Sequence, residues 1–193
     1  SSVSELCDSE NHGTVTRALF YKNSIDCLPL GDIVSSVVTF IQGSPDISLK
    51  FSHTLPDGKR AELIDGHIYY MAPPSRKHQD ISVELSSAIK DYIRSHAGKC
   101  KVYAAPFAVY LDEKTDTYVE PDISVICDPD KLDDKGCKGA PDWIIEIVSP
   151  GSRQMDYYTK LFKYRTAGVR EYWIVDPTKN FILVYDFEKN GSE

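Results

Sequence analysis

The chain has 193 residues, enough for one substantial hydrophobic core and a small appendage. Hydrophobic residues make up 41% and charged residues 26%, and no apolar run approaches the roughly 20 residues that span a bilayer, which predicts a soluble protein without membrane partners. The net charge of −7 argues against broad, nonspecific affinity for nucleic acid. The N-terminus lacks the features of a secretory signal, and the five cysteines are odd in number, widely spaced and free of Cys-x-x-Cys pairs. We therefore expect a cytoplasmic protein with reduced thiols rather than a disulfide framework or a zinc site.

The first part of the chain differs from the rest. Ser, Asn, Asp and Gly dominate the first fifteen positions, and the short apolar run Ile33–Ile41 fits either a helix or a strand. We interpret residues 1–50 as an N-terminal appendage and residues 51–193 as the folded domain. The apolar run is then expected to dock on the domain surface or to mediate self-association.

Secondary-structure signals become clear after Arg60. The Asp65-Gly66 dipeptide joins two strand-like runs and predicts a β-hairpin over Ala61–Met71. Apolar residues at helical spacing predict a helix over Arg76–Ala97. The pattern then predicts three strands, a second helix and two closing strands: Lys101–Leu111, Tyr118–Cys127, Trp143–Val148, Arg153–Ala167, Arg170–Val175 and Phe181–Phe187. This order predicts an α/β fold with a central sheet flanked by helices.

Two carboxylates stand inside apolar strands. Asp122 follows a proline at the start of one run, and Glu146 lies among isoleucines and valines in Trp143–Val148. Burying a carboxylate there is costly unless a metal, a base or a hydrogen-bond network compensates. On neighbouring strands the two carboxylates, with the carbonyl of Ile147, could bind Mg²⁺ or Mn²⁺ at one sheet edge. The alternatives are that Asp122 merely caps its strand and that Glu146 forms a salt bridge, for which Arg153 and Arg170 are the candidate partners.

A lysine within reach of two carboxylates completes the minimal equipment for metal-dependent phosphodiester hydrolysis. Lys160 could orient or help deprotonate the attacking water and offset charge in the transition state. Asp156 stands four residues earlier, so the two side chains share one helix face. An ordinary exposed ion pair between them, worth about 0.3–0.5 kcal/mol, is the competing interpretation.

Several further side chains are candidate auxiliaries. Glu62 on the hairpin could reach the same metal or orient a water, whereas His78 could contact a phosphate or a metal-bound water and Tyr164 lies one turn after Lys160. Each also has a purely structural interpretation: Glu62 as an isolated acidic residue, His78 as a surface histidine and Tyr164 as a core tyrosine. The basic residues around the second helix could form either a nucleic-acid-binding face or a solvated helix surface; they include Arg153, Lys163, Arg165 and Arg170. The alternating Asp and Lys residues of 128–138 predict a solvated loop.

As an ordered set, several motifs resemble the Uma2 family, formerly a domain of unknown function, within the PD-(D/E)XK nuclease superfamily. They are Glu62-Leu-Ile-Asp-Gly66, Met71-Ala-Pro-Pro-Ser75, His78-Gln79, Pro121-Asp122-Ile-Ser-Val125, Pro141 to Pro150, Asp156…Lys160…Tyr164 and Gly168 to Pro177. The resemblance covers about Thr54 to Phe187. It implies a restriction-endonuclease-like fold with a mixed central sheet, a divalent metal and cleavage of phosphodiester bonds in DNA.

The chain departs from the superfamily pattern at one position. The pattern places a lysine two residues after the glutamate, where this chain has Val148. The resemblance suggests that Lys160 supplies the amine from the helix instead.

Three functions fit the residues. The first is a metal-dependent deoxyribonuclease in which Asp122, Glu146, Lys160 and Glu62 form the catalytic set; cutting both strands of a duplex favours a homodimer. The second is a non-catalytic module that binds nucleic acid or protein and retains the nuclease fold, which the acidic balance and Val148 favour. A glycosidase with Asp122 and Glu146 as acid and base is a weaker third, since nothing predicts an aromatic-lined cleft. Dependence on magnesium or manganese separates the first from the others.

Overall fold

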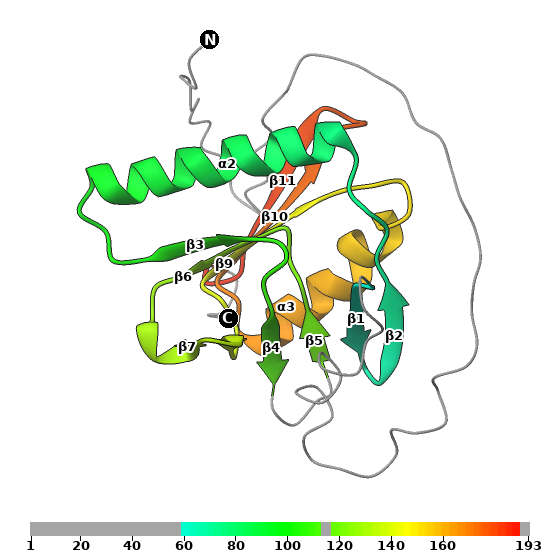
Figure 1. The fold of residues 1–193 in the computed structure, drawn as a ribbon, viewed down its shortest axis with the longest axis horizontal. Helices are drawn as coiled ribbons and strands as arrows, with labels where there is room; N and C mark the ends of the chain where they lie inside the picture. The colour runs from blue at the N-terminus through cyan, green and yellow to red at the C-terminus, as the bar shows by residue number, and fades with distance from the viewer. Residues whose placement is uncertain (1–58, 113–116, 190–193) are drawn as a thin grey trace.

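A computed structural model describes residues 59–112 and 117–189 of the chain (Figure 1). The predictions for residues 1–50, including the run Ile33–Ile41, lie outside the described residues. The described part is an α/β fold, as predicted, but with two mixed β-sheets in place of one. None of its helices is long and apolar enough to cross a membrane.

The larger core is organised around a five-stranded sheet with the order β11-β10-β9-β6-β3. Strands β9 and β10 are parallel, and the other neighbours are antiparallel. The bounds are Lys101–Ala104 for β3, Ile123–Ile126 for β6, Trp143–Ile147 for β9, Glu171–Asp176 for β10 and Phe181–Asp186 for β11. Strand β9 is central and nearly all buried, so any polar side chain on it is enclosed by the fold.

The second sheet has six short strands in the order β2-β1-β5-β4-β8-β7. Its first pair is the predicted Asp-Gly hairpin, because Asp65 and Gly66 both adopt the positive φ that a tight hairpin turn requires. The bounds are Ala61–Ile64 for β1, His67–Tyr70 for β2, Val109–Asp112 for β4, Thr117–Val119 for β5, Leu132–Asp133 for β7 and Gly136–Lys138 for β8.

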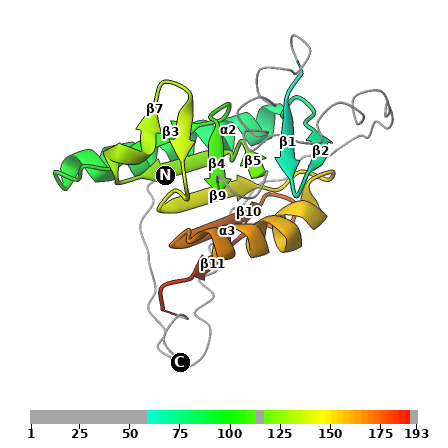
Figure 2. The same cartoon turned by 90° about the horizontal axis from the view of Figure 1, so that it is seen from below.

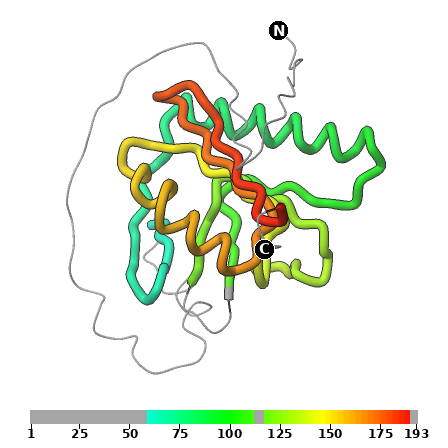
Figure 3. The backbone as a smooth tube through the Cα atoms, turned by 180° about the vertical axis from the view of Figure 1, so that it is seen from behind, coloured from blue at the N-terminus to red at the C-terminus, as the bar shows by residue number. Residues whose placement is uncertain are grey.

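Helices cover both faces of the five-stranded sheet (Figure 2). Helix α2 (Arg76–Ser95) begins after Ser75, whose side chain accepts a hydrogen bond from the backbone N–H of His78. On the opposite face a π-helical segment, η2 (Met155–Lys160), continues into α3 (Leu161–Ala167). Gly168 ends α3 in the left-handed conformation, with φ of 92°. Figure 3 shows this helical stretch lying along the back of the molecule.

Two predicted strands are each divided between the two sheets. The run from Lys101 forms β3 and then β4, and the run ending at Cys127 forms β5 and then β6. Both divisions fall at a proline, Pro106 or Pro121, which cannot donate a ladder hydrogen bond. The apolar pattern predicted where extended chain lies but not the crossing between sheets.

The alternation of side chains along β9 separates two cores. Ile145 and Ile147 face α2 and pack with Ile123, Val125 and Ile89. Ile144 and Val148 face the other way, into the core that contains Tyr164 and Tyr172. Because successive strand residues point to opposite faces, Glu146 lies on the same side as Val148, toward η2 and α3.

The prediction of reduced cysteines is wrong at one pair. Cys100 directly precedes β3 and Cys127 directly follows β6, and these strands pair with Lys101 opposite Ile126. The register therefore sets the two cysteines side by side, and they form a disulfide although 27 positions separate them. Cys137 is buried and free.

The predicted solvated loop over 128–138 contains regular structure. A 3₁₀ turn, η1 (Pro129–Lys131), precedes the β7–β8 hairpin. Strand β8 pairs in parallel with β4, and Cys137 is buried there. The sequence did not predict this hairpin, because Cys137 is a single buried side chain in a segment of alternating charged residues.

Candidate active site

Asp122 and Glu146 lie opposite each other on neighbouring strands. Strands β6 and β9 pair with Ile123 opposite Ile145, so the next positions outward are Asp122 and Glu146. The backbone N–H of Ile147 donates to Asp122 Oδ2 at 2.7 Å, and the backbone N–H of Asp122 lies 3.4 Å from Glu146 Oε2. Asp122 thus holds a backbone group, as the capping interpretation predicted, while also facing the second carboxylate.

Lys160 reaches this pair from the helical layer. Its Nζ donates to Glu146 Oε1 and to Glu62 Oε1, each at 2.9 Å. Asp156 and Lys160 are only 2% and 4% exposed, so the interpretation of an exposed ion pair between them is wrong. The π-helical turns of η2 contain both residues, and such widened turns recur at functional sites.

Val148 stands where the family resemblance leads us to expect a lysine. Val148 is 3% exposed and packs in the core beneath η2 and α3, on the same sheet face as Glu146. A lysine there would have to bury its charge in an apolar cluster. Lys160 brings an ammonium group to Glu146 from the opposite side of that interface.

Glu146 is satisfied by two donors on one oxygen. Besides Lys160, the Tyr164 hydroxyl donates to Glu146 Oε1 at 2.6 Å, so Tyr164 is both a core side chain and part of the site. The predicted alternative, a salt bridge from Glu146 to Arg153 or Arg170, is not what the structure has. Arg153 pairs with Asp176, and Arg170 pairs with Glu188 and Asp142.

Glu62 connects the site to the six-stranded sheet. It stands on β1 and accepts hydrogen bonds from Lys160 and from the backbone N–H of Glu120, the latter at 3.0 Å. Glu120 is a neighbour that the sequence reasoning missed. It is 7% exposed and accepts from Arg60 Nε at 2.7 Å and from the Tyr118 hydroxyl at 2.6 Å. Its signal was available, because an acid that immediately precedes a Pro-Asp pair between apolar runs is itself unusual.

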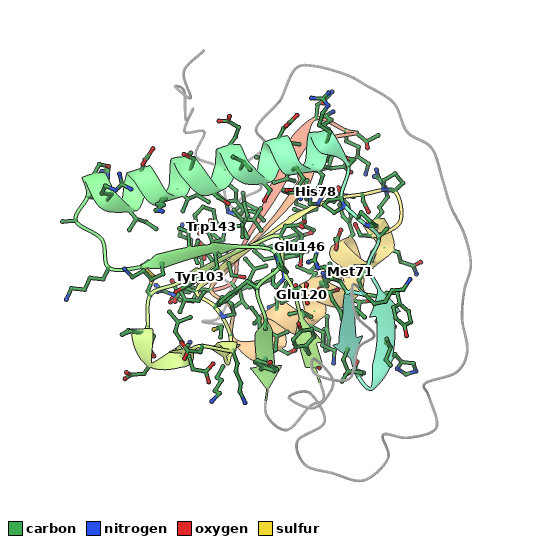
Figure 4. The ribbon with its side chains drawn as sticks, in the orientation of Figure 1. Met71, His78, Tyr103, Glu120, Trp143 and Glu146 are labelled. Carbon is green, nitrogen blue, oxygen red and sulfur yellow. A yellow bond between two sulfur atoms is a disulfide. The ribbon has the colours of Figure 1, made fainter. Side chains whose placement is uncertain are left out.

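His78 enters the site from the start of α2. Its Nε2 lies 3.1 Å from Asp122 Oδ2, and its side chain is 13% exposed, so the alternative of a surface histidine is wrong. Nδ1 is buried without a hydrogen-bond partner among the described residues. Figure 4 shows His78, Glu146 and Glu120 in that order between α2 and the strands β4 and β5.

The electrostatics of the cluster are dominated by burial and excess negative charge. Burial raises the pKa of Glu146 well above 4.5; Lys160 opposes this, and the charges of Asp122, Asp156 and Glu62 add to it. Burial also raises the pKa of Asp156, to about 6, again against the opposing charge of Lys160. One lysine therefore does not neutralise the carboxylates that surround it.

Carboxylates of the same cluster raise the pKa values of the two basic groups, Lys160 and His78. Burial alone would lower the pKa of Lys160, but the charges of Glu146, Glu62 and Asp156 outweigh it and raise this pKa well above 10.5. Burial likewise acts to lower the pKa of His78, and the hydrogen bond and charge of Asp122, with the Ile147 carbonyl, raise it above 6.5 instead. Lys160 is thus an ammonium ion at neutral pH.

The donor chemistry of the cluster fits a hard divalent cation. Carboxylate oxygens of Asp122 and Glu146 and the carbonyl of Ile147 are ligand types that Mg²⁺ and Mn²⁺ accept. In residues 59–112 and 117–189, no group of three or more His, Cys, Asp or Glu side chains is arranged to hold a metal ion. A cation bound here would therefore use two carboxylates and a backbone oxygen and retain several waters, as Mg²⁺ commonly does.

The basic residues predicted to contact nucleic acid are dispersed. Lys163 pairs with Asp65 at the hairpin turn, and Arg165 is exposed on α3. Arg170 precedes β10, whereas Asp176, the partner of Arg153, ends it. A strand of this length spans roughly 20 Å, so Arg153 and Arg170 lie at opposite ends of the sheet.

This combination, a mixed α/β fold with a carboxylate–lysine cluster at one end of the five-stranded sheet, is that of a nuclease-like protein. Residues 49–192 match the model of the Uma2 family, described as putative restriction endonuclease, and the chain belongs to that family.

Two proteins illustrate the relationship. An uncharacterized protein of Synechocystis, slr1290, is 28% identical over 134 residues, which cover 69% of each chain. The crystal structure of a putative nuclease belonging to DUF820, from Anabaena variabilis, superposes with a TM-score of 0.61. That structure is 23% identical and covers 76% of this chain and 80% of its own, and at this identity it supports the fold.

Proposed function

We propose that the chain is a metal-dependent endonuclease that hydrolyses phosphodiester bonds in DNA. The observation that carries the proposal is the pair of the partly buried Asp122 and the buried Glu146, which face each other across neighbouring strands while Lys160 contacts Glu146 at 2.9 Å. Membership of a family described as putative restriction endonuclease supports the same class of reaction.

Asp122, Glu146 and the Ile147 carbonyl are the groups that would hold Mg²⁺ or Mn²⁺. A bound cation of this kind polarises the phosphate and lowers the pKa of a coordinated water. Burial first, and then the negative charges of Asp122, Asp156 and Glu62, raise the pKa of Glu146, and a bound cation would stabilise its ionised form. His78, in contact with Asp122 Oδ2, orients that carboxylate.

Lys160 acts as a fixed positive charge in this proposal. Because the surrounding carboxylates raise its pKa well above 10.5, Lys160 is a poor proton acceptor. A metal held by Asp122 and Glu146 would lower the pKa of the attacking water, so that its proton could pass to solvent. Its ammonium group orients the attacking water and offsets charge that develops on the phosphoryl oxygens. Glu62 and Tyr164 hold the geometry, since Glu62 accepts from Lys160 and Tyr164 donates to Glu146.

We further propose that the active form is a homodimer. Each chain offers one carboxylate–lysine cluster among its described residues, and cutting both strands of a duplex needs two.

Plasmid nicking tests the proposal. Supercoiled plasmid DNA is incubated with the protein and Mg²⁺ or Mn²⁺, with EDTA as the metal-free condition. Wild type should nick only with metal, and Glu146→Gln should lower the rate by about 10³-fold, because metal-centred charge stabilisation is worth several kcal/mol. Glu84→Gln removes an exposed carboxylate from α2 and should nick at the wild-type rate. Equal nicking by Glu146→Gln, or nicking in EDTA, would contradict the proposal.

A non-catalytic binding module is the second candidate. The net charge of −7 and the pairing of Arg153, Lys163 and Arg170 with carboxylates favour it. A mobility-shift gel run beside the nicking assay separates the two functions, since a nucleic-acid-binding module retains DNA in the gel but nicks none of it with either metal.

A further inference from the structure

A groove of about 390 Å³ lies beside the carboxylate cluster and takes no part in the proposed chemistry. Pro150, Gly151, Arg153, Tyr157, Tyr158 and Lys179 contribute to its lining. Its size falls within the range of small-ligand sites. The chain that forms it runs from the end of β9 into η2, so the groove is built from residues that connect the site's own elements.

The groove and the carboxylates share one end of the five-stranded sheet. Strands β9 and β10 are parallel, with Ile174 opposite Glu146 and Val175 opposite Ile147. Asp176 therefore stands one position beyond Ile147, and it anchors the groove by accepting from Arg153 at 2.8 Å and from the Tyr157 hydroxyl at 3.0 Å. On η2, Asp156 of the cluster directly precedes Tyr157 of the groove. A polymer bound at the cluster would therefore have the groove within reach.

The groove carries a surplus of positive charge. Asp176 is fully buried and offsets Arg153, which keeps 35% of its side chain exposed. Lys179 is exposed and forms no salt bridge with a carboxylate among the described residues. Two cations against one carboxylate leave an excess of one positive charge, next to a cluster whose excess is negative. An anionic ligand is the complement of this lining.

The positions of these groups are set by neighbouring contacts. The backbone N–H of Lys179 donates to Asp176 Oδ1 at 3.1 Å, and its Nζ lies 5.0 Å from the centre of the Tyr157 ring. Lys179 thus covers the Tyr157 ring, whereas Tyr158 is 71% exposed. The Tyr158 ring is available for stacking by a planar group.

We propose that this groove binds one unpaired nucleotide of the DNA strand next to the cleavage site, with a phosphate held by Arg153 and Lys179 and the base stacked on Tyr158. The inference rests on the proposed function, to which it adds a strand-binding subsite adjoining the cleavage site. Stacking on an aromatic ring accepts any base, so the subsite positions the strand without reading its sequence. It also explains how an acidic protein can hold DNA, since one local cationic groove replaces a broad basic face.

Equilibrium binding of a labelled oligonucleotide tests the subsite. Fluorescence anisotropy is measured with the full chain and a single-stranded oligodeoxynucleotide of about ten nucleotides, a typical length for such sites. Ca²⁺ replaces Mg²⁺, so that the carboxylates are neutralised while turnover is suppressed. The groove variants are Tyr158→Ala and Lys179→Gln. Their matched controls are Tyr92→Ala, which removes a tyrosine 65% exposed on α2, and Lys90→Gln, which removes an exposed lysine from the same helix.

Tyr158→Ala should weaken binding about tenfold, the usual loss for one stacked base. Lys179→Gln should flatten the salt dependence by about 0.7 in log–log slope, the loss of one phosphate contact to a single strand. The controls should match wild type. Groove variants that bind like the controls overturn the inference, as does a wild-type protein that binds no oligonucleotide. Nicking of plasmid DNA is measured separately. If the groove variants weaken binding but wild type does not nick, the subsite is supported and the endonuclease is contradicted. If wild type nicks and the groove variants bind normally, the endonuclease is supported and the subsite is contradicted.

Discussion

The same dipeptide begins two neighbouring strands at opposite ends of the sheet. Pro121-Asp122 precedes β6 and Pro141-Asp142 precedes β9, and these strands are antiparallel. Each aspartate accepts a 2.7 Å hydrogen bond from a backbone N–H of the other strand's far end, Asp122 from Ile147 and Asp142 from Cys127. The two local structures are near copies of each other.

Their surroundings differ completely. Asp142 pairs with Arg170, whose side chain is 54% exposed, and the nearby disulfide from Cys127 to Cys100 closes that end of the sheet. Asp122 instead faces the buried Glu146 and contributes to the charge that raises its pKa. The Pro-Asp motif is therefore a strand cap at both ends, and the chemistry arises from what η2 and β1 bring to one of them.

The strongest test of this comparison exchanges each aspartate for its neutral isostere. Asp122→Asn should lower metal-dependent nicking by about 10³-fold, because the amide still caps the strand but supplies no ligand charge. Asp142→Asn should leave the rate within about threefold of wild type, since its end of the sheet takes no part in the reaction. Plasmid nicking at saturating Mg²⁺ measures both. Comparable losses in the two variants would mean that the shared capping role, and not the carboxylate cluster, explains the effect.

Loss of the partner cation at each end gives the next largest difference. Lys160→Met should lower the free energy of unfolding at pH 8 by about 3–5 kcal/mol, because Glu62 and Glu146 would stay buried without a positive charge. Arg170→Met breaks an exposed pair and should cost less than about 1 kcal/mol.

Denaturant unfolding monitored by circular dichroism measures both variants, in EDTA so that no cation substitutes for the lysine. Equal losses, or a Lys160→Met protein as stable as wild type, would show that the buried charge is compensated by groups other than Lys160.

The sequence predicted most elements because their signals are local. The Asp65-Gly66 turn, the stripe of α2 and the glycine after α3 each depend on a few neighbouring residues. The two crossings between sheets at Pro106 and Pro121 were missed because an apolar pattern is the same whichever sheet a strand joins. The disulfide was missed for a related reason: only the register of β3 on β6 sets Cys100 beside Cys127.

Sequence patterns likewise predicted the site residues that have a local signal and missed the contacts that depend on packing. Glu146 was conspicuous because a carboxylate is rare inside a five-residue strand that is otherwise apolar and buried. The contact between Lys160 and Glu62, which are 98 positions apart, depends on how η2 packs against β1 and has no local signal. The sequence did not distinguish Asp122 from Asp142, because each follows a proline at the start of an apolar strand. Only the packing shows that Arg170 lies beside Asp142 and not beside Asp122.

The smallest expected effect is a pH dependence confined to the Asp122 end. The pKa of Asp156 is raised by burial from 3.8 to about 6, so the folded protein binds this proton more tightly than the unfolded chain does. Stability of the metal-free protein should therefore fall as the pH rises from about 4 to about 6, by at most about 3 kcal/mol from this group.

Asp156→Asn removes the titrating proton and should flatten the fall. Asp91→Asn, at an exposed position of α2, should keep it, since that carboxyl is solvated in both states. Urea midpoints in EDTA across this range measure the slopes, and Mg²⁺ should restore stability at the upper end by binding the ionised carboxylates. A slope unchanged by Asp156→Asn would mean that another group of the cluster causes the fall. An equal flattening by Asp91→Asn would mean that the effect does not come from the buried cluster.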